Sequence, residues 1–271
     1  VCSSDLRPGG HYGYRTKTTI NQSGSDIVKV QKEMVEEAGV DMMLETEMDY
    51  IYREEPQSGR VLGIRVKDAD GVKNIRAKNG VVLATGGFSG NEEMRQEYVP
   101  WIGEEMPTTN HVGATGEGIK IAQQIGANTL HMSYIQLYPF AEPSKGYLDH
   151  VAVVPFSGPS FGIVYVDENG ERFVNEGERR DVVSMAEMNS GGFPTFSIFN
   201  ESMMTKFTTK EDMESGMEKG RVFKADTLEE LAAEISSHNY GRDGVNMPAE
   251  NLIDTIEQHN EYIKYISERY L

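Results

Sequence analysis

The chain has little cysteine, few basic residues for its acidic content, and no long apolar run. One cysteine, Cys2, among 271 residues excludes a disulfide framework and a metal site built from several cysteines. The 26 basic residues are outnumbered by 43 acidic ones, which gives a formal net charge of −17. An acidic chain without a basic run is a poor partner for nucleic acid or an anionic membrane surface. No window approaches the roughly 18 apolar residues of a membrane-spanning helix.

The length allows a sizeable core and one or two domains. The sequence begins with Val1 rather than Met and has no signal-like segment. We therefore expect an internal piece of a longer protein, with any targeting sequence upstream. A single cysteine does not distinguish compartments, so the location stays unknown, either cytoplasmic or exported from a bacterium. A glycine-rich aromatic loop at 7–14 is interpreted as a connector.

One stretch organises the sequence, Gly80-Val-Val-Leu-Ala-Thr-Gly-Gly-Phe-Ser-Gly-Asn91. Its apolar run at 81–84 predicts a strand buried on both faces. The turn Thr85-Gly86-Gly87 lets the backbone approach a ligand closely, and a helix is expected to begin within 91–98. This order holds nucleotide-type cofactors in many proteins, because free N–H groups at the turn face the ligand. Taken alone, the motif is more often a simple connection between two elements.

Further elements are predicted on both sides of that stretch, and no internal repeat is evident. Helices are expected from apolar residues at helical spacing, at 25–38, 119–126, 227–235 and along the face that runs from Leu252 to Ile266. Strands are expected from β-branched or alternating runs, at 40–44, 49–53, 61–67, 73–78, 150–156, 162–166 and 195–199. A tight turn at 167–170 leads into a returning strand at 172–174. This mixture predicts an α/β or α+β fold.

A second glycine motif, Thr115-Gly116-Glu117-Gly118, precedes the predicted helix at 119–126. A helix that begins there exposes its first N–H groups beside residues with little side chain, which suits a polar ring or a carbonyl group. A glycine-rich helix start without a ligand explains the motif equally well.

Five motifs follow one another in a fixed order. They are Ala84-Thr-Gly-Gly87, Thr109-Asn110, Thr115-Gly-Glu-Gly118, Tyr134-Ile-Gln-Leu-Tyr-Pro139 and Gly170-Glu-Arg-Phe-Val-Asn-Glu-Gly-Glu-Arg-Arg-Asp181. This succession resembles the flavoprotein subunit family of fumarate reductase and succinate dehydrogenase, most closely the soluble fumarate reductases. The resemblance covers nearly the whole chain after Leu6.

The resemblance implies a Rossmann-like α/β domain that binds FAD, interrupted by an α+β clamp domain that holds substrate against the flavin. Residues 1–132 would belong to the FAD-binding domain and 133–271 to the clamp. The family's opening Gly-x-Gly-x-x-Gly motif has no counterpart here, and neither does its closing segment with a substrate-binding His and Arg. We therefore expect this stretch, taken alone, to bind FAD poorly and not to turn over.

The resemblance also implies which residues contact the cofactor and the substrate, position by position. It implies no metal site. The cofactor-binding positions are Ala84, Thr85, Gly86, Gly87, Thr109, Asn110 and Gly116. The substrate-binding positions are Thr115, Glu117 and Tyr138.

The resemblance also implies that Arg180 donates a proton to the substrate α-carbon while the flavin gives hydride to the β-carbon. Hydride addition to a C=C bond conjugated to a carboxylate builds negative charge, which a fixed guanidinium stabilises. Because the pKa of arginine exceeds ~12, Arg180 must be reprotonated through a relay. Alternatively, Arg179 and Arg180 only pair with Glu176, Glu178 or Asp181.

Two departures from the family bear on the substrate. Fumarate reductases have His where Tyr138 lies, and a Tyr stacks on a flat ring but carries no positive charge at neutral pH. The urocanate reductase branch also has Tyr there. The Glu and Arg of the family's proton relay fall near Phe156 and Pro159, with Asp149 and His150 as nearby titratable residues. We therefore expect a urocanate- or cinnamate-like acid rather than fumarate.

The favoured function is a FAD-dependent reductase of a small unsaturated carboxylic acid. A haem, flavin or NADH module outside this stretch would supply the electrons. Two alternatives stay open: a flavin-dependent dehydrogenase similar to the 3-ketosteroid dehydrogenases, and a catalytically silent ligand-binding relative.

Overall fold

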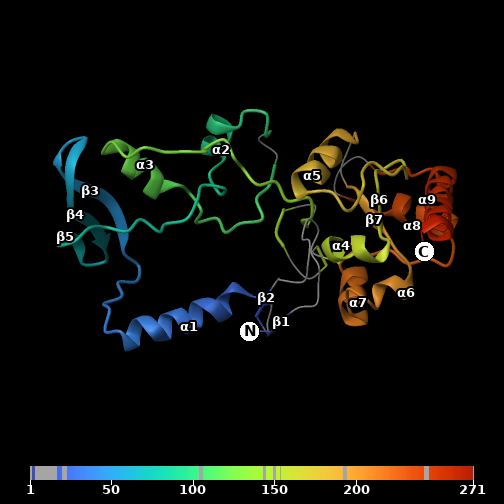
Figure 1. The fold of residues 1–271 in the computed structure, drawn as a ribbon, viewed down its shortest axis with the longest axis horizontal. Helices are drawn as coiled ribbons and strands as arrows, with labels where there is room; N and C mark the ends of the chain where they lie inside the picture. The colour runs from blue at the N-terminus through green and yellow to red at the C-terminus, as the bar shows by residue number, and fades with distance from the viewer. Residues whose placement is uncertain are drawn as a thin grey trace. The chain divides into compact units, whose positions relative to one another are not determined.

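The computed structural model describes residues 2–3, 17–19, 23–103, 106–142, 145–148, 151–152, 154–191, 194–240 and 244–270. The chain forms two compact units (Figure 1). One unit is Thr19–Ile135, and the other comprises Val1–Thr18 with Gln136–Leu271. The predicted loop at 7–14 lies outside the described residues, as do Asp149 and His150. No helix in the described ranges has the length and apolar composition that crossing a bilayer requires.

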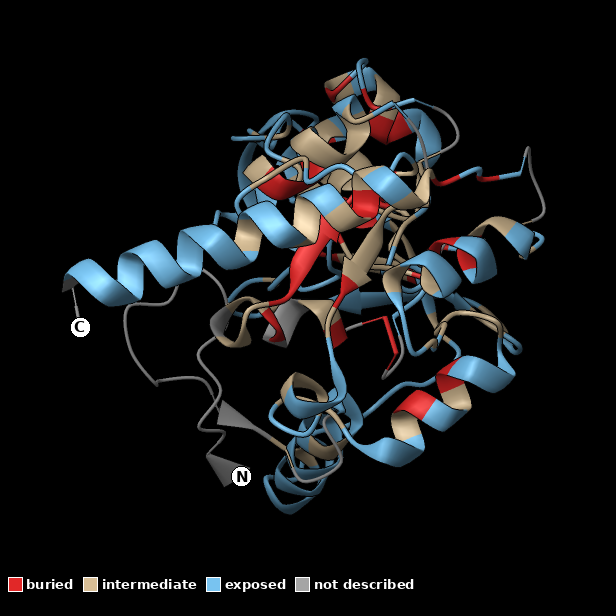
Figure 2. Ribbon diagram, turned by 90° about the vertical axis from the view of Figure 1, so that its right-hand side faces the viewer, coloured by how far each residue is buried: buried red, intermediate tan, exposed pale blue. Residues whose placement is uncertain are grey.

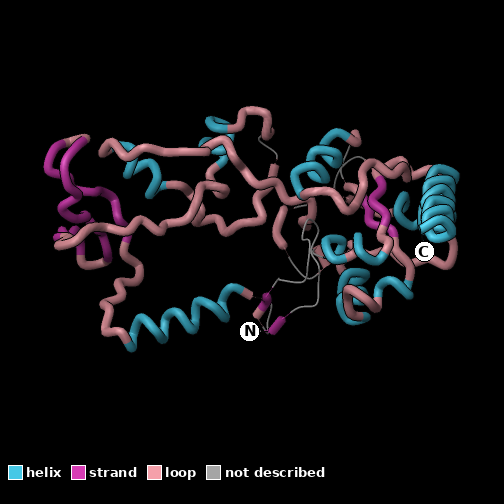
Figure 3. The backbone as a smooth tube through the Cα atoms, viewed as in Figure 1, coloured by secondary structure: helices cyan, strands magenta, loops and turns pink. Residues whose placement is uncertain are grey.

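The unit Thr19–Ile135 contains a three-stranded antiparallel meander (Figure 3). Its strands are β3 (Glu47–Glu55), β4 (Ser58–Asp68) and β5 (Gly71–Arg76), as the alternating runs predicted. The turn between β3 and β4 is short, because Glu55 already pairs with Ser58. Gly63 on β4 is required by packing, since a Cβ there would lie 2.1 Å from the Ile75 carbonyl oxygen on β5.

The helices of this unit begin and end at the residues that the sequence indicates. Helix α1 (Gly24–Glu37) is capped by Ser23, whose side chain accepts a hydrogen bond from the Ser25 N–H, and it ends before Gly39, which has φ +67°. Helix α2 (Glu92–Tyr98) follows Asn91, and α3 (Glu117–Gln124) follows Gly116. All three predicted helical segments are confirmed.

Two strand predictions in this unit are wrong. Residues 81–84 and 40–44 have no regular structure, and Val82 and Leu44 are 91% and 70% exposed. An apolar run forms a strand only when neighbours complete its hydrogen bonds and cover its faces. Among the described residues, no strand pairs with either segment. The apolar face of α1 is likewise exposed, with Met34 at 63%.

The second unit places a small antiparallel sheet among helices (Figure 1). The sheet pairs β6 (Val164–Val166) with β7 (Phe196–Ile198), which confirms both predicted strands. The short strands β1 (Cys2–Ser3) and β2 (Lys17–Thr18) pair with each other. The helices are α4 (Val154–Ser157), the 3-10 helix η1 (Pro159–Phe161), α5 (Arg180–Asn189), α6 (Glu201–Met204), α7 (Lys210–Glu218), α8 (Leu228–Ser237) and α9 (Ala249–Tyr270).

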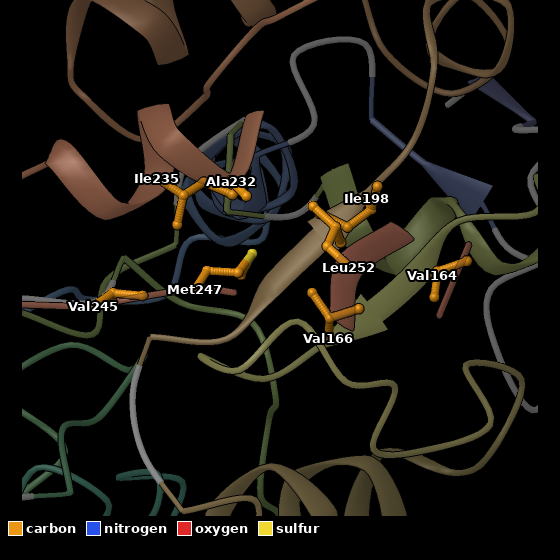
Figure 4. Close-up of a cluster of buried hydrophobic side chains, with 8 residues drawn as sticks. All are labelled: Val164, Val166, Ile198, Ala232, Ile235, Val245, Met247 and Leu252. Atoms are coloured by element: carbon orange, nitrogen blue, oxygen red, sulfur yellow. The ribbon is translucent and has the colours of Figure 1, made fainter. Parts of the chain in front are cut away.

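The core of this unit lies where α8 and α9 pack on the sheet, and its members come from four separate parts of the sequence (Figure 4). They are Val164, Val166, Ile198, Ala232, Ile235, Val245, Met247 and Leu252. Helix α8 is fixed at its start by Thr227, whose hydroxyl accepts a hydrogen bond from the Glu230 N–H at 3.2 Å. Leu252 on α9 is fully buried, whereas the C-terminal half of that helix is exposed (Figure 2). Both predicted helices are confirmed.

The strand predicted at 150–156 is wrong where the structure describes it. Val151 and Ala152 lie in a turn, and Val154–Ser157 form the short helix α4. Pro155 lacks the N–H group that an interior strand position needs, so the β-branched run cannot pair. The turn at 167–170 is confirmed by a bond from the Gly170 N–H to the Asp167 carbonyl at 3.1 Å. The returning segment makes one bridge, between Val166 and Arg172.

Substitution of Gly63 tests the close approach of β4 and β5. We expect Gly63→Ala to destabilise the meander by on the order of 2 kcal/mol, because the new Cβ displaces the backbone of Ile75. Chemical denaturation measures the change in unfolding free energy. Gly80→Ala is the control, since no atom lies within 4 Å of a Cβ there. Equal stability of the two variants would contradict the packing argument.

Candidate functional site

The two glycine motifs meet in the unit Thr19–Ile135. The Gly116 N–H donates to the Gly87 carbonyl at 3.1 Å, and the Gly90 N–H donates to the Ala114 carbonyl at 2.8 Å. The Asn91 side-chain amide donates to the Thr115 carbonyl at 2.8 Å. Three hydrogen bonds therefore join loops that are more than twenty residues apart in the sequence.

Close packing explains why glycines lie at the start of α3. A Cβ at Gly118 would lie 2.1 Å from the Thr85 hydroxyl oxygen, and one at Gly116 would lie 2.5 Å from the Met94 sulfur. Gly116 also has φ +74°, a left-handed conformation that favours glycine. The first turn of α3 is thereby held against the loop that carries Thr85.

The turn at Gly86 and Gly87 is open to an approaching group. No atom lies within 4 Å of the Cβ position of either glycine. Nearby, α3 begins at Gly116 without a side-chain cap, so its first N–H groups point outward without a capping oxygen. A bare backbone turn beside an uncapped helix start fits a flat or charged group that accepts hydrogen bonds.

The other predicted residues of this unit surround the same loops. Thr109 and Asn110 lie in the exposed loop before α3, and the Asn110 amide donates to the Ser89 hydroxyl at 3.0 Å. Ala84 and Glu117 are exposed. No group of three or more His, Cys, Asp or Glu side chains in the described part of the chain is arranged to hold a metal ion.

In the second unit, the arginines of the 170–181 motif have different partners. Arg179 pairs with Asp181 at 3.0 Å, and Arg172 pairs with Glu176 at 2.6 Å. Arg180 is the first residue of α5, and its guanidinium carbon lies 5.1 Å from the centre of the Tyr138 ring. Two of the acidic residues considered as partners for Arg180, Glu176 and Asp181, thus form ion pairs with other arginines of the motif.

Tyr138 belongs to a series of aromatic contacts that ends in the core. Its ring meets Phe140 edge to face at 5.8 Å, and Phe140 meets Tyr165 at 5.5 Å. Burial raises the pKa of Tyr138, while the nearby Arg180 acts in the opposite direction. The phenol is therefore neutral at neutral pH, as the sequence predicted for this position.

Glu176 fixes the motif to the sheet. It is buried, and its carboxylate accepts hydrogen bonds from the Arg172 guanidinium and from the Tyr165 N–H at 3.0 Å. Burial alone would raise the pKa of Glu176, but these hydrogen bonds outweigh burial and lower it. The carboxylate is charged and paired beneath the segment that leads to Arg180.

Glu187 is a titratable residue that the sequence interpretation missed. It lies two helical turns after Arg180 on α5, and burial raises the pKa of its carboxyl to about 7, with an opposing bond from Thr195. Ser184 lies between them along the helix, and its buried hydroxyl has no hydrogen-bond partner among the described residues. The sequence signal that could have identified Glu187 is its spacing. It lies four residues after Val183, which is buried, so both residues fall on the same face of α5.

Neither Phe156 nor Pro159, near which the family's relay positions are expected, has a titratable side chain. Phe156 falls in α4 and Pro159 begins η1. Tyr138 and Arg180 are brought together in one unit, while the positions expected to bind the cofactor, Thr115 and Glu117 lie in the other.

Comparison with known proteins identifies the family. A family model described as the FAD binding domain matches residues 5–267. The chain belongs to the FAD binding domain family. FAD is accordingly the cofactor, and its requirement for hydrogen-bond donors fits the open glycine turn and the uncapped start of α3.

Named relatives and solved structures bear on the chemistry. The chain is 35% identical to the NADH:acrylate oxidoreductase of Vibrio harveyi (75% of this chain, 19% of the relative) and 31% identical to the urocanate reductase of Eggerthella lenta (94% and 41%). A flavocytochrome c3 fumarate reductase in its open conformation aligns with TM-score 0.65 and 26% identity (96% of this chain, 43% of that chain). A 3-ketosteroid delta1-dehydrogenase from Sterolibacterium denitrificans aligns with TM-score 0.65 and 25% identity (86% and 42%).

These matches confirm the resemblance that the motifs indicated, and they confirm a FAD-binding fold like that of the fumarate reductase flavoproteins. The chain spans less than half the length of these relatives and structures.

The raised pKa of Glu187 predicts a pH dependence of stability. Because the folded state holds the proton more tightly than the unfolded state, stability falls as pH rises from about 4.5 towards the folded pKa of about 7 and levels off above it. Glu187→Gln removes this loss, so its unfolding free energy relative to wild type should rise by about 2 kcal/mol between about pH 5 and pH 8.

Denaturation at several pH values measures this difference. Glu178→Gln, at an exposed position, removes the same formal charge and serves as the control. An equal pH dependence in Glu187→Gln and wild type would show that the carboxyl titrates as an ordinary surface group.

Proposed function

We propose that this protein is a FAD-dependent oxidoreductase that reduces the C=C bond of an α,β-unsaturated carboxylic acid. The observation that carries the proposal is the placement of Arg180 at the start of α5, over the ring of Tyr138. The names of the relatives support it, because acrylate, urocanate and fumarate all have a double bond conjugated to a carboxylate.

Arg180 acts where negative charge develops. Reduced FAD, when bound, supplies the hydride that adds to the β-carbon of the substrate. As that bond forms, charge builds on the α-carbon and the carboxylate, and the Arg180 guanidinium stabilises it. Arg180 then donates a proton to the α-carbon and is reprotonated from solvent or a neighbouring acid.

The cofactor contacts belong to the open glycine turn and the loops tied to it. We assign them to the positions expected from the motifs, which are Ala84, Thr85, Gly86, Gly87, Thr109, Asn110 and Gly116. Thr115 and Glu117 are assigned to the substrate. Residues 1–132 are assigned to the FAD-binding domain and 133–271 to the clamp. We also propose that the chain is an internal piece of a longer enzyme.

The substrate is proposed to be urocanate- or cinnamate-like rather than fumarate. A neutral Tyr138 carries no positive charge that could bind a second carboxylate. The match to a urocanate reductase over 94% of the chain supports this choice. The electron donor is a haem, flavin or NADH module, and the match to an NADH-linked reductase favours the last.

A steroid dehydrogenase activity is the weaker alternative. Removal of hydrogen from a steroid ring does not require a guanidinium as proton donor, whereas Arg180 is held at an exposed helix start in the family motif.

Substitution of Gly87 tests the cofactor assignment. Open space surrounds its Cβ position, so Gly87→Ala should leave the unfolding free energy unchanged. If FAD lies against this turn, the added methyl group should weaken FAD binding about tenfold or more. Flavin fluorescence titration of the complete enzyme measures the affinity, with Gly80→Ala as the control in equally open space. Unchanged affinity in both variants would move the cofactor away from Gly87.

Replacement of Arg180 tests the chemistry. In the complete enzyme of which this chain is proposed to be a part, loaded with FAD and reduced by a viologen dye, Arg180→Ala should lower kcat by about two to three orders of magnitude, because the developing charge loses its counter-charge. Dye oxidation is followed with urocanate, a cinnamate, acrylate and fumarate in parallel. Arg179→Ala is the matched control, since it removes the same charge from an exposed pair with Asp181. Equal losses in the two variants would argue for a general charge effect.

A further inference from the structure

We infer that Tyr138 is a positioning residue, whose ring holds the Arg180 guanidinium in place for proton donation. This inference rests on the proposed function, because it gives Arg180 its catalytic role. In this role the Tyr138 ring contacts Arg180, whereas the sequence predicted that it stacks on a ring of the substrate.

The contact has the geometry of a cation–π interaction. The guanidinium carbon of Arg180 lies 5.1 Å from the ring centre, within the roughly 6 Å over which such pairs attract. The ring itself is fixed, because Phe140 meets it edge to face and in turn meets the buried Tyr165. The Tyr165 hydroxyl donates to the Pro155 carbonyl at 2.8 Å, which anchors the far end of the series.

Arg180 needs such a contact because of its place on α5. The start of a helix carries a partial positive charge, which disfavours a cation at the first position. Two acidic residues of the same motif are ion-paired with other arginines, Asp181 with Arg179 and Glu176 with Arg172. The negative face of the Tyr138 ring attracts the guanidinium, and this attraction offsets the repulsion from the positive end of the helix dipole.

An aromatic ring also preserves the charge that the reaction uses. A carboxylate partner would neutralise the guanidinium, whereas the face of a tyrosine has no formal charge. Contact with the Tyr138 ring does not itself neutralise the positive charge of Arg180. Because the guanidinium lies over one face of the ring, that face is not available for stacking by a substrate.

The two roles of Tyr138 predict different substrate dependences. A positioning ring affects every substrate alike, since each needs the proton from Arg180. A platform for a substrate ring affects urocanate and leaves acrylate, which has no ring, unchanged. The hydroxyl is dispensable for positioning, so phenylalanine should replace tyrosine.

The test measures kcat and KM of the complete, FAD-loaded enzyme with acrylate and with urocanate. We expect Tyr138→Phe to keep kcat within about threefold for both acids, and Tyr138→Leu to lower it about tenfold for both, with KM little changed. Tyr138→Met, which keeps more bulk beside Phe140, replaces Tyr138→Leu if that variant unfolds at a lower temperature. In an Arg180→Ala background, Tyr138→Leu should have no further effect on the residual rate.

Two kinetic outcomes would overturn the inference while leaving the proposed function intact. Loss of urocanate reduction alone in Tyr138→Leu would make the ring a substrate platform. An equal loss in Tyr138→Phe and Tyr138→Leu would assign the role to the hydroxyl.

A spectroscopic measurement tests the inference without turnover. The Arg180 Hε signal, assigned by its loss in Arg180→Lys, should show an upfield ring-current shift in wild type and Tyr138→Phe that is absent in Tyr138→Leu. Absence of this shift in wild type overturns the inference. Failure of the proposed function would differ, because no acid would then oxidise the dye while the shift persisted.

Discussion

The placement of Arg180 depends on one buried carboxylate. Glu176 binds the Arg172 guanidinium through both oxygens and also accepts the Tyr165 N–H of β6. A charge in this position is stable only because three donors replace its water. The same bonds hold the motif from 170 to 181 against the sheet, so that α5 starts beside the aromatic series. Removal of the pairing would release both the loop and the helix start.

Local signals in the sequence predicted the elements whose stability is mostly local. Ser23 and Thr227 predicted the starts of two helices, and the structure confirms both. Alternating apolar residues predicted the meander of β3 to β5. The failures at 40–44 and 81–84 have a common cause. A strand depends on partners distant in sequence, and an apolar run does not specify them. At 150–156, the β-branched residues outweighed Pro155 in the prediction, although proline excludes an interior strand.

The sequence suggested candidate residues for the site but not their contacts. Motif order, through a family resemblance, selected Arg180 over its neighbour, yet both arginines precede an acidic residue and sequence alone left their pairing open. The structure separates them, because Arg179 turns to Asp181 whereas Arg180 lies over Tyr138. Glu187 went unnoticed because its raised pKa arises from burial in the folded chain, which its position in the sequence does not reveal.

Asn91 performs two tasks with one amide group, and this narrows what can replace it. Its side-chain oxygen accepts the Met94 N–H at 3.0 Å and caps α2, while its side-chain nitrogen donates to the Thr115 carbonyl at 2.8 Å. Aspartate or serine would serve the first task, since both are good N-caps, but an ionised carboxylate cannot donate to a carbonyl. The hydrogen bond that holds the two glycine loops together, and not the cap of α2, therefore limits which residues can replace Asn91.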